Sequence, residues 1–280
     1  MSTITITAAE VNKLRQRTGA GMMDCKKALT EANGDIEKAI DILREKGQKV
    51  AMNRSDRQAK EGSAIAKISA DGKKATLTVL NCETDFVSRN QEFIDAAEKI
   101  AEIAINGNFN TLDELKTAQY GGGITVEQKI VELIGKTGEK MELSQYEFLK
   151  GEKVFAYNHP GNRLASIVAF NKADAGNLNE TGKEIAMQIA AMAPIAIDKD
   201  DVTKEAVDRE MQVGMEQARQ EGKPENMVEK IAAGKLNKFY KECTLLNQDY
   251  IKDSKKTVRQ FLQDNDKELK ITGFRRAVIG

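Results

Sequence analysis

Apolar residues at the start of the chain recur with the spacing of a helix, and glycine or polar positions interrupt them twice. Thr7 and Glu10 have the spacing of a capping box, which predicts where a first helix begins. A second helix is expected to end at Gly34, and Asp35 is expected to cap a third that ends at Gly47. The positions that these helices would bury are Val11, Leu14, Cys25, Ala28, Leu29, Ala32, Ile36, Ala39, Ile40 and Leu43. The pattern therefore predicts a small three-helix module.

The hydrophobic period changes from helical to alternating after a polar segment at residues 48–61, which we interpret as a partly helical linker. Two strands at residues 64–68 and 75–80 are predicted to form a hairpin, and a loop then leads to a helix at residues 91–105. The same order recurs, with strands and a helix at residues 154–157, 164–170 and 184–192. This recurrence predicts a core of two related α+β halves.

Two further apolar stripes of helical spacing, on either side of Gly222-Lys223-Pro224, interrupt the second half. They predict an antiparallel helical hairpin, which is either a homodimerisation device or an insertion without a partner. The expected fold class is therefore α+β. The N-terminal module and the start of the linker are expected at residues 1–54, and the first core half at 55–150. The second core half is expected at 151–192 and 244–280, with the hairpin inserted at 193–243.

Composition narrows the classes of function. Lys plus Arg and Asp plus Glu both total 43, so the net charge is zero and no direct nucleic-acid partner is expected. No apolar run approaches the ~18 residues of a membrane span. The three cysteines lie far apart and His159 is the only histidine, which argues against a disulfide framework and a metal site. Reduced thiols, and no signal peptide pattern at residues 1–5, favour a cytoplasmic protein. No cofactor is expected.

Two patterns suggest enzyme chemistry, and the spacing argues against both. Gly135-Lys136-Thr137 is similar to the end of a phosphate loop, but that motif needs a glycine where Ile130 stands. Cys82, Asp85 and His159 are the residue types of a cysteine hydrolase, but no glycine pattern for an oxyanion hole flanks the cysteine. We therefore assign no catalytic residue and do not expect an enzyme.

Exposed-looking apolar residues favour a binding protein instead. Met22 and Met23 follow a Gly-Ala-Gly turn, where flexible thioethers suit a docking surface; alternatively, one of them packs inward and completes the module. Phe86 stands beside Asp85 in a polar loop. It is either a contact for a partner or a staple onto its own helix, and the residues alone do not decide.

Two motifs resemble one known family. The run from Leu14 to Leu29, continued at residues 31–40, resembles the beginning of the bacterial elongation factor Ts family. Asn81-Cys82-Glu83-Thr84-Asp85-Phe86-Val87 is similar to that family's central Thr-Asp-Phe-Val motif. The resemblance implies a ubiquitin-associated-like module and a guanine nucleotide exchange factor acting in translation. Its partner would be elongation factor Tu, in the GDP-bound and nucleotide-free forms.

The resemblance also implies which residues touch that partner. Asp85 and Phe86 are expected to enter the GTPase domain. The resemblance implies that the module contacts the same domain through Arg15, Met22 and Met23. Contact with a β-barrel domain of the partner is expected from residues 159–163 and 250–251. The complete set is Arg15, Met22, Met23, Thr84, Asp85, Phe86, Val87, His159, Arg163, Tyr250 and Ile251. Many family members carry a further helical module after the stretch at 272–276, and none is expected here because the sequence ends at Gly280. An adaptor of ubiquitin-associated type that drives no exchange is the rival function, and it has no need of the loop at Asp85.

Overall fold

Capping side chains begin two of the three helices of the N-terminal module in the structure, a computed structural model that describes residues 6–280. Residues 1–5, on which the expectation about a signal peptide rests, lie outside the described residues. Helix α1 (Ala8–Thr18) begins with the expected capping box of Thr7 and Glu10. Helix α2 (Met22–Glu31) follows, and Asp35 caps α3 (Ile36–Asn53). The three helices bury most of the predicted apolar positions against one another, and Ile36, Ile40 and Leu43 stay partly buried at the edge of that cluster.

Gly47 does not end the third helix, as the sequence predicted. Helix α3 continues to Asn53, and Gly47 is buried where α3 lies against α7 (Val126–Thr137). Glycine serves here as a point of close approach between helices, and the tertiary contact outweighs its weak helix propensity. The segment predicted as a partly helical linker is therefore helical as far as Asn53, and a turn follows at residues 54–57.

The core consists of two three-stranded antiparallel sheets with the same order of elements, so the predicted α+β class and the two similar halves are confirmed. In each, a hairpin supplies an edge strand and the central strand, and a third strand returns after intervening helices. The first sheet contains β1 (Glu61–Ile68), β2 (Lys74–Cys82) and β5 (Met141–Lys150), in the order β1-β2-β5. The second contains β6 (Lys153–Asn158), β7 (Leu164–Phe170) and β10 (Ile271–Val278), in the order β10-β7-β6. The sequence analysis missed both returning strands, β5 and β10.

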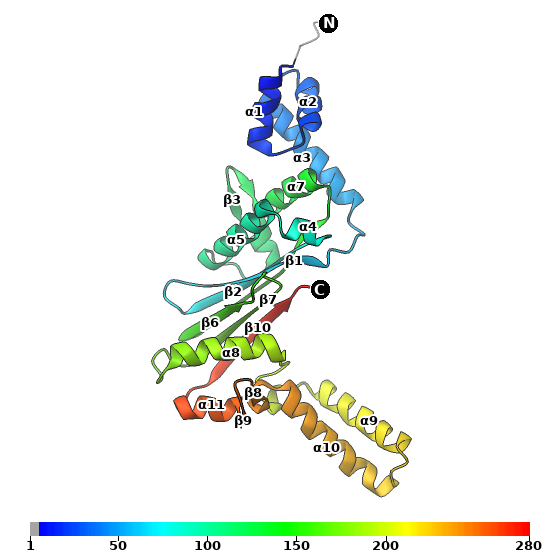
Figure 1. Cartoon of the computed structure of the whole chain (residues 1–280), viewed down its shortest axis with the longest axis vertical. Helices are drawn as coiled ribbons and strands as arrows, with labels where there is room; N and C mark the ends of the chain where they lie inside the picture. The colour runs from blue at the N-terminus through cyan, green and yellow to red at the C-terminus, as the bar shows by residue number, and fades with distance from the viewer. Residues whose placement is uncertain (1–5) are drawn as a thin grey trace.

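Helices cover one face of each sheet, and the other two faces pack together (Figure 1). Helix α5 (Gln91–Asn106) lies on β1 and β2, and α8 (Leu178–Met192) lies on β6 and β7. The smaller elements of the first half are α4 (Asp85–Ser88), α6 (Leu112–Thr117), β3 (Gln119–Gly121) and β4 (Ile124–Thr125). Those of the second are η1 (Lys199–Asp201), η2 (Leu245–Asn247), β8 (Asp249–Tyr250), β9 (Asp253–Thr257) and α11 (Val258–Asn265).

Alanine dominates the layer between the two sheets. Its buried residues are Ala64, Ala66, Ala75, Leu77, Val79, Leu149, Val154, Ala165, Ile167, Ala169, Ala277 and Ile279. Small side chains let the sheets approach closely, so hydrogen bonds form between them at the edge of β1. The Ala64 N–H donates to the Asn162 carbonyl at 2.7 Å. The side chain of Asn158 bonds both backbone groups of Ala66, at 2.7 and 3.0 Å. The outer edge of β1 is thereby satisfied by the second sheet.

The predicted hairpin is confirmed as α9 (Lys204–Gln220) and α10 (Glu225–Cys243), which project from the end of the core opposite the module (Figure 1). The two helices pack closely at Gly214 and Ala232. A larger side chain at residue 214 would disturb this contact. Whether the hairpin mediates homodimerisation stays a prediction. Among residues 6–280, no helix combines the length and the apolar character needed to cross a membrane.

Asn158→Ala should lower the free energy of unfolding by about 1–3 kcal/mol, because it leaves both backbone groups of the buried Ala66 without partners. Urea unfolding measures this loss. Asn108→Ala is the matched control, since that side chain is exposed in a loop. Equal stability of the two variants would contradict the role assigned to Asn158.

Candidate functional site

A single turn of helix, α4, presents Phe86 to solvent. The segment predicted as a loop forms this short helix because the Thr84 side chain caps it, accepting the N–H of Val87 at 3.4 Å. Val87 packs against the core of the first half, and Phe86 faces the opposite way with 84% of its surface exposed. The alternative that Phe86 is a staple onto its own helix is therefore wrong. An exposed phenylalanine of this kind is a candidate contact residue.

Two carboxylates hold the start of α4 in place. Glu139 accepts hydrogen bonds from the Thr84 N–H at 3.1 Å and from its hydroxyl at 2.8 Å. Glu83 accepts from the guanidinium groups of Arg54 and Arg57, each at 3.1 Å. It also accepts from the backbone N–H of Lys140 at 2.6 Å. These interactions tie the helix both to the segment after α3 and to the segment after α7.

The electrostatics of Glu83 follow from these partners. Burial alone would raise its pKa, but the Lys140 N–H and the guanidinium groups of Arg57 and Arg54 outweigh that effect and lower the pKa. Glu83 is therefore a charged group with 13% of its side chain exposed. Sequence reasoning missed both Glu83 and Glu139 as functional residues. The only sequence signal was the position of Glu83 inside the motif, since its partners lie far away along the chain.

Asp85 lies in a partly exposed ion pair on the same helix. Its carboxylate is 3.1 Å from the guanidinium of Arg89, and both side chains remain largely accessible to water. Nearby, Arg163 pairs with Glu61, whose hydrogen bond raises the pKa of Arg163 against the opposing effect of desolvation. The charge of Asp85 raises that pKa further. The structure thus brings Arg163, from the second half, to the surface around α4.

Cys82 lies beneath α4, away from solvent. Its thiol is buried and donates to the Thr84 carbonyl at 3.2 Å. Burial raises the pKa of Cys82 to about 12, so the thiolate is absent at neutral pH. His159 is exposed in the turn between β6 and β7, where its Nδ1 lies 2.9 Å from the Tyr157 hydroxyl. These features speak against a cysteine hydrolase. Within residues 6–280, no group of three or more His, Cys, Asp or Glu residues is placed to hold a metal ion.

Both methionines of the N-terminal module are exposed. Met22 and Met23 are 54% and 64% exposed, so the expectation that one packs inward is wrong. Leu14, Cys25 and Leu29 fill the module core without them. The two methionines line an open groove of about 340 Å³ between α1 and α2, together with Ile6, Ala8, Val11, Asn12 and Lys26. Arg15 is exposed on α1 outside this groove.

The structure separates the residues expected to contact a β-barrel domain. His159 and Arg163 lie in the turn between β6 and β7, beside β1 and the α4 surface. Tyr250 and Ile251 lie in and beside β8, towards the end of the core that carries the hairpin (Figure 1).

Tyr250 is buried rather than available to a partner, which corrects the expectation that it makes contact. Its ring stacks on Phe261, with centroids 4.2 Å apart, and its hydroxyl donates to Glu184. Ile251 remains exposed, and its N–H donates to the Gln188 side chain at 2.9 Å. Tyr250 therefore supports the turn that carries Ile251.

Comparisons with known proteins agree with the geometry and the motifs. A family model described as elongation factor TS matches residues 83–280. A protein named elongation factor Ts from Cytophaga hutchinsonii is 50% identical over 272 residues, which cover 97% of this chain and 98% of the relative. Relatives of the same name from Flavobacterium psychrophilum and Amoebophilus asiaticus are 48% and 49% identical, over 99% and 98% of this chain and 99% of each relative. The similarity includes the N-terminal module as well as the segment around α4.

Glu83→Gln should destabilise the protein at neutral pH, because an amide accepts weaker hydrogen bonds than a carboxylate from two guanidinium groups. The pKa of Glu83 is lowered by folding, so the stability it contributes is fully present above the ordinary glutamate pKa of about 4.3. That contribution is lost as the pH falls through the lowered value. Urea unfolding of both proteins between pH 7 and pH 3 should show their difference shrinking with acid. Glu229→Gln, at an exposed position of α10, is the control; a pH-independent difference for Glu83→Gln would rule out the tether.

Proposed function

The chain belongs to the elongation factor Ts family and is a translation elongation factor, and we propose that it promotes the release of GDP from elongation factor Tu. In this proposal the helix α4 inserts Phe86 into the GTPase domain. The observation that carries it is the exposure of Phe86 on a helix that two carboxylates hold in place. The N-terminal module acts as a ubiquitin-associated-like docking unit, and the protein works in the cytoplasm.

Helix α4 is already ordered in the free protein, so Phe86 can insert into the partner without first ordering its own backbone. A loop that orders only on binding loses conformational entropy at that moment, which weakens the complex. The tethers at Glu139 and Glu83 have already ordered the backbone around Thr84. Most of the interaction energy of Phe86 is then available for displacing groups of the partner. This rigidity distinguishes the proposal from the rival adaptor, which would bind through the methionine groove alone and has no use for a fixed aromatic.

Exchange needs no covalent chemistry in this chain. Nucleotide and exchange factor bind the same GTPase with a negative coupling free energy, and each weakens the other equally. A tenfold loss of nucleotide affinity requires about 1.4 kcal/mol of differential binding. A buried aromatic hot spot supplies about 2–4 kcal/mol, which suffices for one or more such factors. Phe86 would apply this energy by separating GTPase helices and shifting the backbone around the phosphates and magnesium.

Asp85 and the methionine groove have supporting roles in the proposal. The ion pair of Asp85 with Arg89 is largely solvated, so the carboxylate is free to exchange this partner for a displaced backbone N–H. Met22 and Met23 present adaptable apolar surface at the far end of the molecule from the hairpin (Figure 1). They would add affinity for the GDP-bound and nucleotide-free partner. Nucleic acid has no direct part in the proposal.

Phe86→Ala should slow GDP release from elongation factor Tu by roughly 30- to 1,000-fold, the equivalent of about 2–4 kcal/mol. Its melting temperature should stay near that of the unsubstituted protein, because the ring is exposed in the free chain. Stopped-flow release of fluorescent GDP and thermal unfolding should be measured on the same preparation.

Phe93→Ala is the matched control for that experiment. Phe93 lies a few residues further along the chain and is only 1% exposed, so its truncation should cost about 3–5 kcal/mol of stability. GDP release by the folded fraction should remain normal. The proposal fails if Phe86→Ala behaves in this way as well, with a large loss of stability and unchanged release.

Met22→Ala combined with Met23→Ala should raise the concentration of this protein that gives half-maximal GDP release, by roughly tenfold or about 1.4 kcal/mol. The maximal rate should persist, because α4 is untouched. Met52→Ala is the control, since Met52 is 75% exposed on α3 but outside the groove. An unchanged half-saturation point in the double variant would remove the groove from the contact surface.

A further inference from the structure

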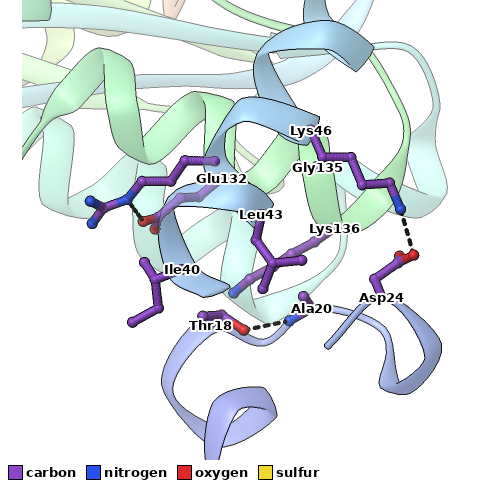
Figure 2. Close-up of a pocket in the computed structure, with 10 residues that line it drawn as sticks. Thr18, Ala20, Asp24, Ile40, Leu43, Lys46, Glu132, Gly135 and Lys136 are labelled. Carbon is purple, nitrogen blue, oxygen red and sulfur yellow. Dashed lines mark hydrogen bonds and ion pairs between the residues drawn. The ribbon is translucent and has the colours of Figure 1, made fainter. Parts of the chain in front are cut away.

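The Gly135-Lys136-Thr137 segment, whose spacing argues against a phosphate loop, lies at the junction between the N-terminal module and the core. It forms the last turns of α7, where α3 of the module packs on the core. Figure 2 shows the small pocket at this junction, with module residues such as Thr18 and Leu43 facing Gly135 and Lys136. The pocket holds only about 30 Å³, so the two parts meet with little space between them.

Two glycines allow the helices to meet this closely. A Cβ atom on Gly47 would lie 2.9 Å from the backbone oxygen of Val131, and one on Gly135 would lie 3.2 Å from the Cα of Gly47. Because backbone atoms of a helix cannot move aside independently, any larger residue at 47 must displace α3 from α7. Glycine is also a poor helix former, so its presence inside two helices has a local cost that the crossing offsets.

Charged side chains fix the orientation around this crossing. Lys136 has 14% of its side chain exposed and contacts Gly19 at the C-terminal end of α1, where the helix dipole favours a cation. The same ammonium group pairs with Glu92 at the start of α5. Arg44 of α3 lies 3.6 Å from Glu132 of α7. The crossing therefore combines the glycine contact with charged side chains from both helices.

Both crossing helices lead directly into the tethers of Phe86. The segment after α3 supplies Arg54, which binds Glu83. The segment after α7 supplies Glu139, which binds Thr84. The position of α3 on α7 thus relates the methionine groove at one end of the module to the α4 helix.

We propose that Gly47, Gly135 and Lys136 form a clamp that sets the orientation of the methionine groove relative to Phe86, so that one partner molecule meets both surfaces in a single geometry. These three are positioning residues, and their role rests on the proposed function. Two linked contacts bind far more tightly than either alone only when their spacing matches the partner. The clamp supplies that spacing before the complex forms.

The geometry can be tested without the partner. Spin labels at Gln16→Cys in α1 and Lys99→Cys in α5, both exposed, report the distance between module and core in a Cys243→Ser background. The full chain should give one narrow distance distribution, and Gly47→Ala should broaden or shift it. Gly234→Ala is the matched control, because that helical glycine in α10 has no atom near its Cβ position; its distribution should stay narrow. A distribution for Gly47→Ala that equals that of the unsubstituted protein would overturn the clamp.

The functional consequence is tested with GDP release from elongation factor Tu. Gly47→Ala should raise the half-saturating concentration by roughly tenfold, a modest part of the 10²- to 10⁴-fold gain from linking two contacts. The maximal rate should be retained. In a background of Met22→Ala and Met23→Ala, Gly47→Ala should cause little further change, because the surface that it orients has already been removed. An undiminished effect in that background would show that Gly47 acts on the core alone, and the clamp proposal would be wrong.

Lys136→Gln provides a second variant that inserts no atom between the helices. It should shift the distance distribution and the half-saturation point in the same direction as Gly47→Ala, and unchanged values for both would count against the clamp. The two proposals fail in different ways. If the unsubstituted protein does not accelerate the release of GDP from elongation factor Tu, the proposed exchange function is wrong. A broad distance distribution in that same protein refutes the clamp alone.

Discussion

The close packing of two sheets through alanine is the constraint on which the rest of the structure depends. Alanine loses no side-chain conformational entropy on burial, and its small side chain allows the two sheets to approach closely. The approach is close enough for Asn158 and Asn162 to satisfy the edge of β1 from the opposite sheet. It also brings Arg163 of the second half beside Glu61 and the charge of Asp85. Because a well-packed layer resists enlargement, the two halves behave as one support for α4.

The sequence was sufficient to predict those elements whose stabilising contacts are made between residues close together in the chain. The capping box at Thr7, the strand hairpins and the helical hairpin were all predictable, because their partners are neighbours in the sequence or are joined by a single short turn. Gly47 was misinterpreted, since its neighbour α7 is distant in the chain and makes a mid-helix glycine useful. The returning strand β5 was missed because a register shift after Leu143 interrupts its alternation of apolar and polar residues. In β10, residues Thr272, Gly273, Arg275 and Arg276 separate the apolar positions.

At the candidate site too, the sequence predicted local features and missed those that depend on contacts between distant segments. The exposure of Phe86 was one of two open alternatives, and only the packing of its neighbour Val87 decided between them. Glu139 carries no sequence signal of its own, because its importance arises from two hydrogen bonds to Thr84. Tyr250 was assigned by position in the chain, but its ring stacks inside the fold. Side-chain burial depends on tertiary contacts between segments that the sequence alone does not bring together.

Cys82 gives the α4 region a chemical property beyond its shape. Peroxides attack the thiolate form of cysteine, and the raised pKa of about 12 leaves almost none of it at physiological pH. Sulfenic acid at this position would insert an oxygen atom beneath the Thr84 carbonyl, where the thiol now donates a hydrogen bond. Burial of this thiol therefore disfavours its oxidation beneath the segment that carries Phe86.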